Sequence, residues 1–446
     1  MRVYSGIFFL LLTVILPNAN GVELAQNGPG QVLLFPFYTA ENEWESYINI
    51  TAPNTPPDKA TAFRVRFPGR GKSFTVYPSK LQNWRASIRH IKNPPSTVMR
   101  VAEGDCVVHE DLTVSLPGSD FEVPGQRGMI EVYALGEFED QGRTCETLAE
   151  RWQPGGLWDI DPQRHLLPGT GALIGELIFI NVKEGLAASY TATALNNLKA
   201  EFPHTPPGST SPNLAEADPI AVVGGDELIP SSGEGIDAVA LALSQNRKTV
   251  INDVILSRGI NARTDWVISY PLDPYKNYKP FEIVHGISDD DFSLLVDDCE
   301  AFGARHRDRP TDKRLDMPID INASVFLWGD GESNFVPEEN AQDVQFFIAM
   351  CGSVNVVSFG DNEPILVRDR IRPLPGGLSP EPKPIPDALQ NSSYSLRWSP
   401  YPAEFPEGSG IPRPVLGFRI TTFQNGTLDD GRTLGNYAIL RPHQRQ

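Results

Sequence analysis

The sequence has few cysteines, few histidines and none of the compact motifs that mark common reaction centres. Its 446 residues include four cysteines and seven histidines. They contain no H-E-x-x-H, no C-x-x-C and no G-x-S-x-G. These absences argue against a zinc protease, a cysteine-ligated metal and the nucleophile elbow of an α/β-hydrolase. We therefore predict a protein that is not an enzyme and that has no catalytic residue, cofactor or metal site.

Beyond its first residues the sequence also lacks a long hydrophobic run. Arg2 precedes an apolar stretch at 7–16, and the small residues Ala19 and Gly21 follow it. This arrangement is typical of a secretory signal peptide, which we place at residues 1–21. No later segment offers the ~18 consecutive apolar residues of a membrane-spanning helix. We expect a protein that is secreted or at the cell surface, with the periplasm as the alternative, and without a transmembrane span.

Basic residues are in the minority. Lys and Arg number 38 against 56 Asp and Glu, which gives a formal net charge of −18 spread along the chain. Because such a surface repels polyphosphate, the composition argues against nucleic acid as a partner.

The four cysteines are Cys106, Cys145, Cys299 and Cys351. An even number of cysteines in an exported chain indicates disulfides. Three pairings are open, and we favour Cys106–Cys145 with Cys299–Cys351 because each pair then stays within one half of the chain. Closing a loop of ~40 residues stabilises the fold by roughly 4 kcal/mol if the loop-entropy model holds.

Helical periodicity is scarce, and short strands separated by turns dominate. In residues 60–67, Phe63, Val65 and Phe67 alternate with Arg64 and Arg66, as expected for a sheet buried on one side. Such spacing predicts a mainly β fold of two antiparallel β-sandwich domains, Ig-like or jelly-roll-like. We place them at 22–202 and 235–446, with a Pro/Gly/Ser-rich linker or long loop at 203–234 and a Pro-rich connection at 372–386. The few expected helices are 144–152, 237–245 and a single turn at 80–86.

Three segments carry more specific expectations. Pro36 places the strand at 31–38 at a sheet edge or a bulge. The L-P-x-T-G sequence at 167–171 is a turn that precedes the apolar strand 172–182, whose hydrophobicity predicts a central strand covered on both faces. Strands at 393–400 and 414–423 are expected to form the last pair, followed by a tail that does not dock.

A few groupings could carry chemistry. The acidic pairs at 159–161 and 289–291 could serve glycoside hydrolysis, and Asp330, Glu332 and Asn334 alternate around Gly331 as oxygen ligands of Ca²⁺ would. Solvated loops and a hairpin turn explain both groupings more simply. The GRGKS sequence at 69–73 lacks the first glycine of a phosphate loop and is a turn between strands. Burial is the ordinary explanation for most of the seven tryptophans, and Trp84 and Trp158, which lie in polar surroundings, are the two to test for the exposure that a carbohydrate platform requires.

Several segments, taken in order, resemble an uncharacterised family of exported proteins from Gram-negative proteobacteria. They include VLLFPFYTAENEWESYINITAPNT at 32–55, GMIEVYALGEF at 128–138, GTGALIGELIFINVKEGLAASYTATAL at 169–195 and PVLGFRITTFQNGTLDDGRTLGNY at 414–437. The resemblance implies export across the inner membrane, a β-rich fold and a place at the cell surface or outside the cell. It supplies no catalytic residue.

The leading hypothesis is an exported, non-enzymatic structural, adhesive or surface-assembly protein that acts through β-sheet surfaces and edges. Its partners would be cell-surface components or further copies of itself, and the strand containing Pro36 is the expected site of strand addition. The alternatives are an extracellular carbohydrate-binding module or glycan-acting hydrolase, and a surface-layer subunit stabilised by Ca²⁺.

Overall fold

The computed structural model describes most of the first 275 residues and selected segments after them. The described ranges are 21–25, 28–53, 55–56, 58–78, 83–102, 105–116, 118–139, 144–167, 173–200, 202–245, 250–257, 260–275, 318–324, 343–349, 353–359, 364–368, 374–375, 393–398, 413–424, 431 and 435–445. The predicted signal peptide up to residue 20, Cys299, Cys351, the acidic run at 289–291 and the proposed Ca²⁺ ligands at 330–334 lie outside these ranges.

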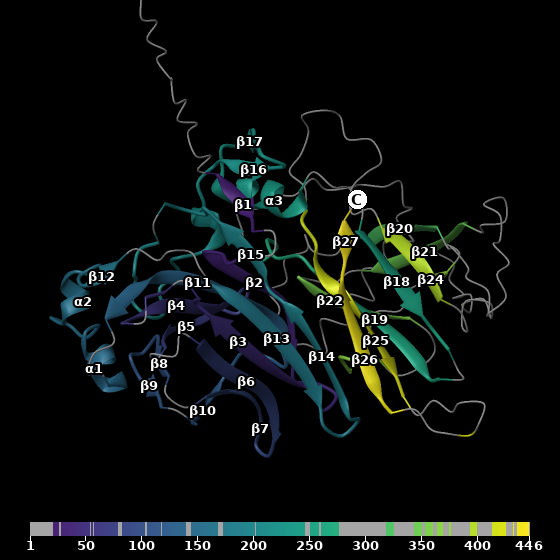
Figure 1. The fold of residues 1–446 in the computed structure, drawn as a ribbon, viewed down its shortest axis with the longest axis horizontal. Coiled ribbons are helices and arrows are strands. Elements are labelled where there is room, and N and C mark those ends of the chain that lie inside the picture. Colours follow the sequence, from purple (N-terminus) through teal and green to yellow (C-terminus); the bar gives the residue numbers. More distant parts are fainter. Residues whose placement is uncertain are drawn as a thin grey trace, which may run out of the picture.

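The chain is mainly β, as predicted, and its largest sheet has eleven strands (Figure 1). β16 runs parallel to β1, whereas the other paired strands of this sheet are antiparallel. In order, the sheet comprises β17 (Asp226–Leu228), β16 (Ala221–Val223), β1 (Val22–Leu24), β15 (Thr193–Asn196), β2 (Val32–Thr39), β11 (Arg127–Glu139), β4 (Lys59–Phe67), β5 (Lys72–Tyr77), β8 (Cys106–His109) and β9 (Val114–Ser115), with β12 (Leu166–Leu167) paired to β11.

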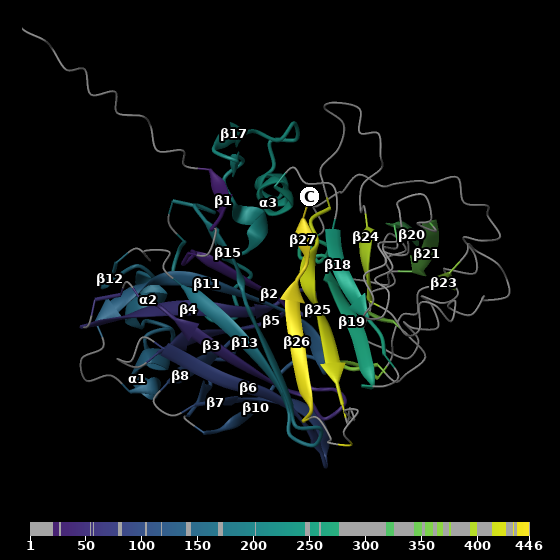
Figure 2. The ribbon, with the colours of Figure 1, turned by 45° about the vertical axis from the view of Figure 1, so that its right-hand side comes forward.

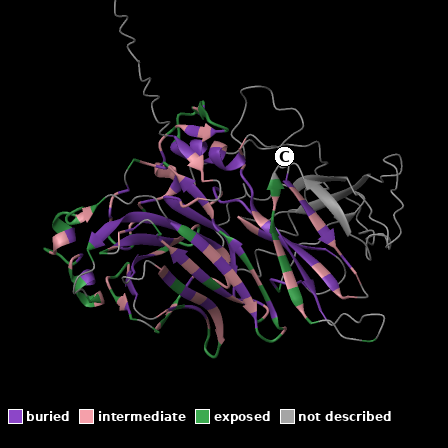
Figure 3. Cartoon of the chain, viewed as in Figure 1, coloured by how far each residue is buried: buried purple, intermediate pink, exposed green. Residues whose placement is uncertain are grey.

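A second, six-stranded antiparallel sheet packs against one face of the first. Its order is β10 (Asp120–Glu122), β7 (Pro95–Val101), β6 (Asn83–Lys92), β3 (Glu45–Thr51), β13 (Ile174–Asn181) and β14 (Leu186–Thr191). Buried side chains of both sheets, among them Phe35, Phe63, Trp84 and Leu177, form one hydrophobic core. Figure 3 shows buried and exposed residues alternating along these strands, which is the pattern of a sheet covered on one face.

The later strands form three smaller sheets. These are β22 (Val354–Phe359), β19 (Ala262–Ser269), β25 (Leu416–Phe423) and β26 (Tyr437–Pro442); β24 (Ser393–Trp398), β18 (Val250–Ile255) and β27 (Gln444–Arg445); and β20 (Pro318–Ser324), β21 (Asp343–Ala349) and β23 (Leu374–Pro375). Figure 2 shows β25 and β26 beside the first two sheets. Phe418 of β25 lies 6.3 Å from Phe37 and 5.0 Å from Tyr190 between ring centroids. The hydrophobic core therefore crosses from one half of the chain to the other, and a division into two sandwich domains is not confirmed.

The segment 203–234, predicted as a linker or long loop, lies on the outer side of the eleven-stranded sheet and contains a short 3-10 helix, η1 (Leu214–Glu216), with β16 and β17. Leu214 is fully buried against α3 (Gly235–Ser244), which confirms the helix expected at 237–245. A buried arginine of β4 explains why this segment packs there. Arg64, expected to point into solvent, is fully buried and donates hydrogen bonds to the carbonyls of Thr205, Pro206, Ser209 and Ser211.

The segment 364–368 is held by side chains from both halves of the chain. Asp265 of β19 accepts hydrogen bonds from the backbone N–H groups of Ile365 and Leu366, at 2.8 and 3.1 Å. The opposite side is bound by the end of β2 and the residues that follow it. Thr39 Oγ1 donates to Leu366 O, Asn42 Nδ2 to Val367 O and Trp44 Nε1 to Ile365 O, while Glu41 accepts from the Arg368 N–H. Ile365, Leu366 and Val367 are buried, so this short segment fastens the two halves together.

The strand containing Pro36 is not an edge. β2 pairs with β15 on one side and with β11 on the other, and all of its residues are buried. The alternative prediction of a bulge is right, because the register with β11 shifts between Gly128 and Ile130, opposite Pro36. β15 has ended at this point, so the missing N–H of proline leaves no ladder bond unmade. Strand addition at Pro36 is not supported, since β2 is fully buried and the Pro36 carbonyl already accepts a hydrogen bond from the Ser269 hydroxyl of β19.

Four further expectations are wrong. β13 lies inside its sheet as predicted, but it alternates buried and more exposed residues and is covered on one face only. β24 and β25 do not pair with each other: β24 pairs with β18, and β25 with β19 and β26. The C-terminal tail does dock, because it supplies β26 and β27. Residues 83–86, placed in a helical turn, begin strand β6.

Candidate functional site

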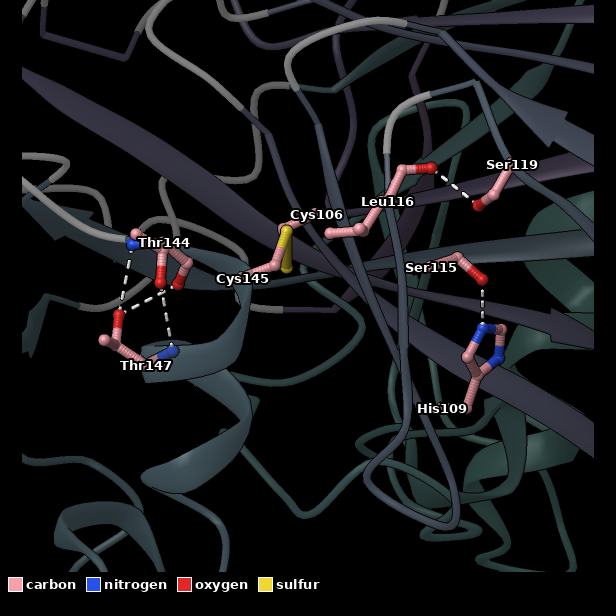
Figure 4. The surroundings of a disulfide bond; sticks show 8 residues. All are labelled: Cys106, His109, Ser115, Leu116, Ser119, Thr144, Cys145 and Thr147. Atoms are coloured by element: carbon pink, nitrogen blue, oxygen red, sulfur yellow. Dashed lines mark hydrogen bonds between the residues drawn. A yellow bond between two sulfur atoms is a disulfide. The ribbon is translucent and has the colours of Figure 1, made fainter.

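The disulfide between Cys106 and Cys145 is confirmed, and it joins the edge of the first sheet to a short helix (Figure 4). Cys106 opens β8, and Cys145 opens α1 (Cys145–Glu150), with 5.2 Å between their Cα atoms. Thr144 caps the helix: its Oγ1 accepts from Thr147 N, while the Thr147 hydroxyl accepts from Thr144 N. The helix predicted at 144–152 is thus present, and the disulfide fixes it beside β8.

A pocket of about 340 Å³ opens close to this disulfide, at one end of the two packed sheets. It lies where β8 and β9, at one edge of the first sheet, meet β10, at an edge of the second. Its apolar wall includes Phe67, Phe74 and Phe121, and its polar wall includes His109 and Ser115. Charged side chains stand around it: Lys72, Glu110, Asp111 and Glu122.

His109 and Ser115 face one another in this pocket, as Figure 4 shows. The His109 Nε2 and Ser115 Oγ atoms are 2.7 Å apart, which is hydrogen-bond distance. Burial lowers the pKa of His109, so its imidazole is neutral at pH 7. Asp111 accepts hydrogen bonds from the N–H and hydroxyl of Thr113. A hydrolytic triad needs its carboxylate on the imidazole, so these contacts give no support to nucleophilic catalysis.

A second buried histidine, which sequence reasoning did not single out, lies behind the disulfide. His204 is fully buried; its Nδ1 lies 2.9 Å from Pro162 O, and its Nε2 lies 2.8 Å from the Tyr77 hydroxyl, which also accepts from Trp152 Nε1. Trp158 packs edge-on to the imidazole at 4.7 Å. Burial lowers the pKa of His204 to about 3, because the charged form would lie among apolar rings. The neutral imidazole is therefore part of the fold.

We expect His204 to make the protein sensitive to acid. Its pKa is about 3 when folded and 6.5 in an unfolded chain. A lowered pKa means that the unfolded state binds the proton, so stability is full above pH 6.5 and is lost as pH falls towards 3. This group alone contributes about 1.4 kcal/mol per pH unit. Urea unfolding of wild type and of His204→Phe from pH 7 to pH 4 measures this contribution. The difference in unfolding free energy between the two proteins should shrink as the pH falls. Parallel curves would refute the assignment.

A buried carboxylate on the same face of the first sheet, turned away from the second sheet, is also fully engaged. Glu131 of β11 accepts hydrogen bonds from the hydroxyls of Tyr133 and Tyr275, each at 2.8 Å. Burial raises the pKa of Glu131, although the nearby Arg66 opposes the shift. Since Glu131 is only 2% exposed, no substrate reaches it in this arrangement, and the cluster ties the turn at Tyr275 to the sheet.

The tryptophans proposed as a carbohydrate platform are both buried. Trp84 lies in the core between the sheets, and Trp158 stacks on Tyr77 with 5.4 Å between ring centroids. Their polar neighbours in sequence misled the prediction, because successive residues of a strand face opposite sides of the sheet and successive residues of a helix point in different directions around its axis. Each of these indoles therefore belongs to a core and neither offers a binding platform.

The acidic pair near Trp158 does not resemble a glycosidase centre. Both carboxylates are exposed at α2 (Leu157–Ile160): Asp159 accepts from Gly155 N, and Asp161 accepts from Gln163 N. These are local turn contacts. The GRGKS sequence forms the turn between β4 and β5, with Gly69 and Gly71 at positive φ as predicted for a turn. Within the ranges described, no group of three His, Cys, Asp or Glu side chains could hold a metal ion.

One open surface of the described chain is the side of the six-stranded sheet that turns away from the core. We call it the outer face. The pairing registers bring Arg100, Ser87, Tyr47, Ile178 and Ser189 into one row across five strands. Tyr47 is 36% exposed and Ile174, further along β13, is 40% exposed. The outer face comprises Glu45, Tyr47, Asn49, Thr51, Arg85, Ser87, Arg89, Arg100, Ile174, Glu176, Ile178, Ile180, Ala187, Ser189 and Thr191.

Charge on the outer face is divided between its two halves. β6 and β7 supply Arg85, Arg89 and Arg100, while β3 and β13 supply Glu45 and Glu176. Asp120 of β10 pairs with Arg89 at 2.8 Å and with Arg100 at 3.4 Å, at the margin of the sheet. The basic side chains of the face therefore lie on β6 and β7, with Asp120 beside them, and Glu176 lies among the isoleucines of β13.

Comparison of the chain with models of known protein families, with curated proteins and with solved structures gave no match. The resemblance to exported proteins of proteobacteria thus stays a prediction. Among the helices described, none is long and apolar enough to cross a membrane.

Proposed function

We propose that this chain is an exported, non-enzymatic structural protein that assembles with copies of itself through the outer face. The observation that carries the proposal is the open side of a six-stranded sheet, with opposite charges on its two halves. The apolar side chains on this face favour a partner that covers them, because Tyr47 and Ile174 are exposed and would gain free energy on burial.

The second copy is favoured as the partner because the outer face is complementary to itself. A two-fold axis parallel to the strands, between β6 and β3, places β6 of one copy over β3 of the other and β7 over β13. In that arrangement Arg85 of one copy lies over Asn49 of the other copy. Glu176 of that other copy is on the neighbouring strand, ~4.8 Å further across the sheet, and is within reach of the same arginine. The stem of Arg100 would lie over Ile178, where its methylene groups bury apolar surface.

We expect reversal of either charge to weaken self-association and a mixture to restore it. Arg85→Glu or Glu176→Arg places like charges together in a symmetric pair, so each variant should associate about tenfold more weakly than wild type. An equimolar mixture of the two variants puts opposite charges together again and should recover most of the affinity. Sedimentation velocity at low ionic strength over a range of protein concentrations measures both effects.

Glu227→Arg makes the same charge change on β17, away from the outer face, and serves as the matched control. Wild type that stays monomeric at all concentrations would refute the proposal, as would equal effects of Glu227→Arg and Glu176→Arg. A monomer that binds on a glycan array through Tyr47 would instead support the carbohydrate-binding alternative.

A further inference from the structure

The pocket beside the disulfide is a second place where the protein can bind a partner. It is about 340 Å³ in volume, which suits a small organic molecule, and it lies at the sheet edges rather than on the outer face. The two surfaces are built from different residues, so a ligand in the pocket is independent of self-association.

Aromatic rings form one wall of the pocket. Phe121 of β10 packs against His109 with 4.7 Å and against Phe74 with 5.2 Å between ring centroids, edge-on in both cases. Phe74 and Phe67 belong to the hydrophobic core, so they are held in place from behind. Such a wall favours a flat or apolar ligand body, and a ring face also attracts a cation.

The charged side chains around the pocket are mainly acidic. Glu110, Asp111 and Glu122 line it together with one cation, Lys72. Hydrogen bonds from Thr113 lower the pKa of Asp111, so that carboxylate is ionised at neutral pH. With His109 neutral, three acidic residues and one lysine line the pocket, so it repels anions and attracts cations.

We propose that this pocket binds a small organic cation whose flat apolar body lies against Phe74 and Phe121 and whose ammonium or amidinium group faces Glu110, Asp111 and Glu122. The paired His109 and Ser115 supply a directional hydrogen-bonding wall at 2.7 Å from one another. The aromatic wall selects the body of the ligand, and the carboxylates select its charge.

Three probes of nearly equal shape test the charge selection: benzamidinium, neutral benzamide and anionic benzoate. Ligand-observed NMR and calorimetric titration of the full chain at low ionic strength should show millimolar binding of benzamidinium. Benzamide should bind roughly threefold to tenfold more weakly, since it keeps the ring and loses the charge, and benzoate should not bind detectably. Added salt should weaken binding of benzamidinium and leave benzamide unchanged.

Two isosteric variants locate the site. Glu122→Gln should weaken benzamidinium about threefold, whereas Glu176→Gln, the same change on the outer face, should have no effect. Phe121→Ala should reduce the affinity for benzamidinium and benzamide alike, with circular dichroism as the check of folding. Benzoate binding as tightly as benzamidinium, no binding of any probe, or equal effects of the two Glu→Gln variants would each overturn the proposal.

Discussion

Asp265→Ala should destabilise the protein by about 2–6 kcal/mol, because it leaves two buried backbone N–H groups without an acceptor. One carboxylate oxygen of Asp265 accepts from both Ile365 and Leu366, and the site is 1% exposed. Water therefore does not replace the lost bonds unless the segment 364–368 moves away. Its contacts with Thr39, Asn42 and Trp44 would then be lost as well.

Asp265→Asn is the matched control, since an amide oxygen can accept the same two bonds. Burial raises the pKa of Asp265, which means that the ionised carboxylate is disfavoured where it lies. A neutral amide avoids that cost, so we expect Asp265→Asn to change stability by less than about 1 kcal/mol. Urea unfolding at pH 7, followed by tryptophan fluorescence, measures both variants. If Asp265→Ala unfolds at the wild-type urea concentration, the segment is not held as described.

The strands could be predicted from the sequence because each depends on local alternation. Phe63, Val65 and Phe67 enter the core as their spacing requires, and the strand that contains them spans Lys59–Phe67. The disulfide between Cys106 and Cys145 was the favoured pairing because both cysteines lie in the same half of the chain, 39 residues apart. Pattern and proximity along the chain are sufficient for features of this kind.

What covers each strand could not be predicted in the same way. Arg64 alternates with apolar residues and so indicates a solvated face, yet residues 205–211, about 140 positions later, cover it. The sequence of the C-terminal strand β26 alternates only weakly and so predicted an undocked tail. The strand is held in place by its pairing with β25. Both outcomes depend on contacts between distant segments, for which a single sequence carries no periodic signal.

The candidate sites show the same division. The pocket joins His109 and Ser115, which are near neighbours in sequence, to Phe74 and Phe121, which lie on different sheets. Neither histidine with a lowered pKa, His109 or His204, stands in a recognisable motif. The outer face could have been anticipated from alternation in 45–51 and 83–92, but its division into basic and acidic halves needs the strand order, in which β3 separates β6 from β13.

Arg64→Ala should cost about 3 kcal/mol or more, because several carbonyls of the covering segment lose their donor at once. The guanidinium is fully buried, and its acceptors are neutral oxygens: the carbonyls of Thr205, Pro206, Ser209 and Ser211 and the hydroxyls of Thr75 and Thr205. Burial lowers the pKa of Arg64 to about 10, so the side chain stays charged at neutral pH while these dipoles replace water around it.

The loss should appear first in the segment that Arg64 holds. In Arg64→Ala, limited proteolysis should cut near residues 203–213 sooner than in wild type, and the urea midpoint should fall. Arg64→Lys keeps the charge but replaces the planar fork with a single ammonium group, which can reach fewer of the carbonyls. Its rate of proteolysis and its urea midpoint should therefore lie between those of wild type and Arg64→Ala. If Arg64→Ala resists protease as well as wild type does, then the apolar contacts of Leu214 suffice to hold the segment and the arginine is not its fastening.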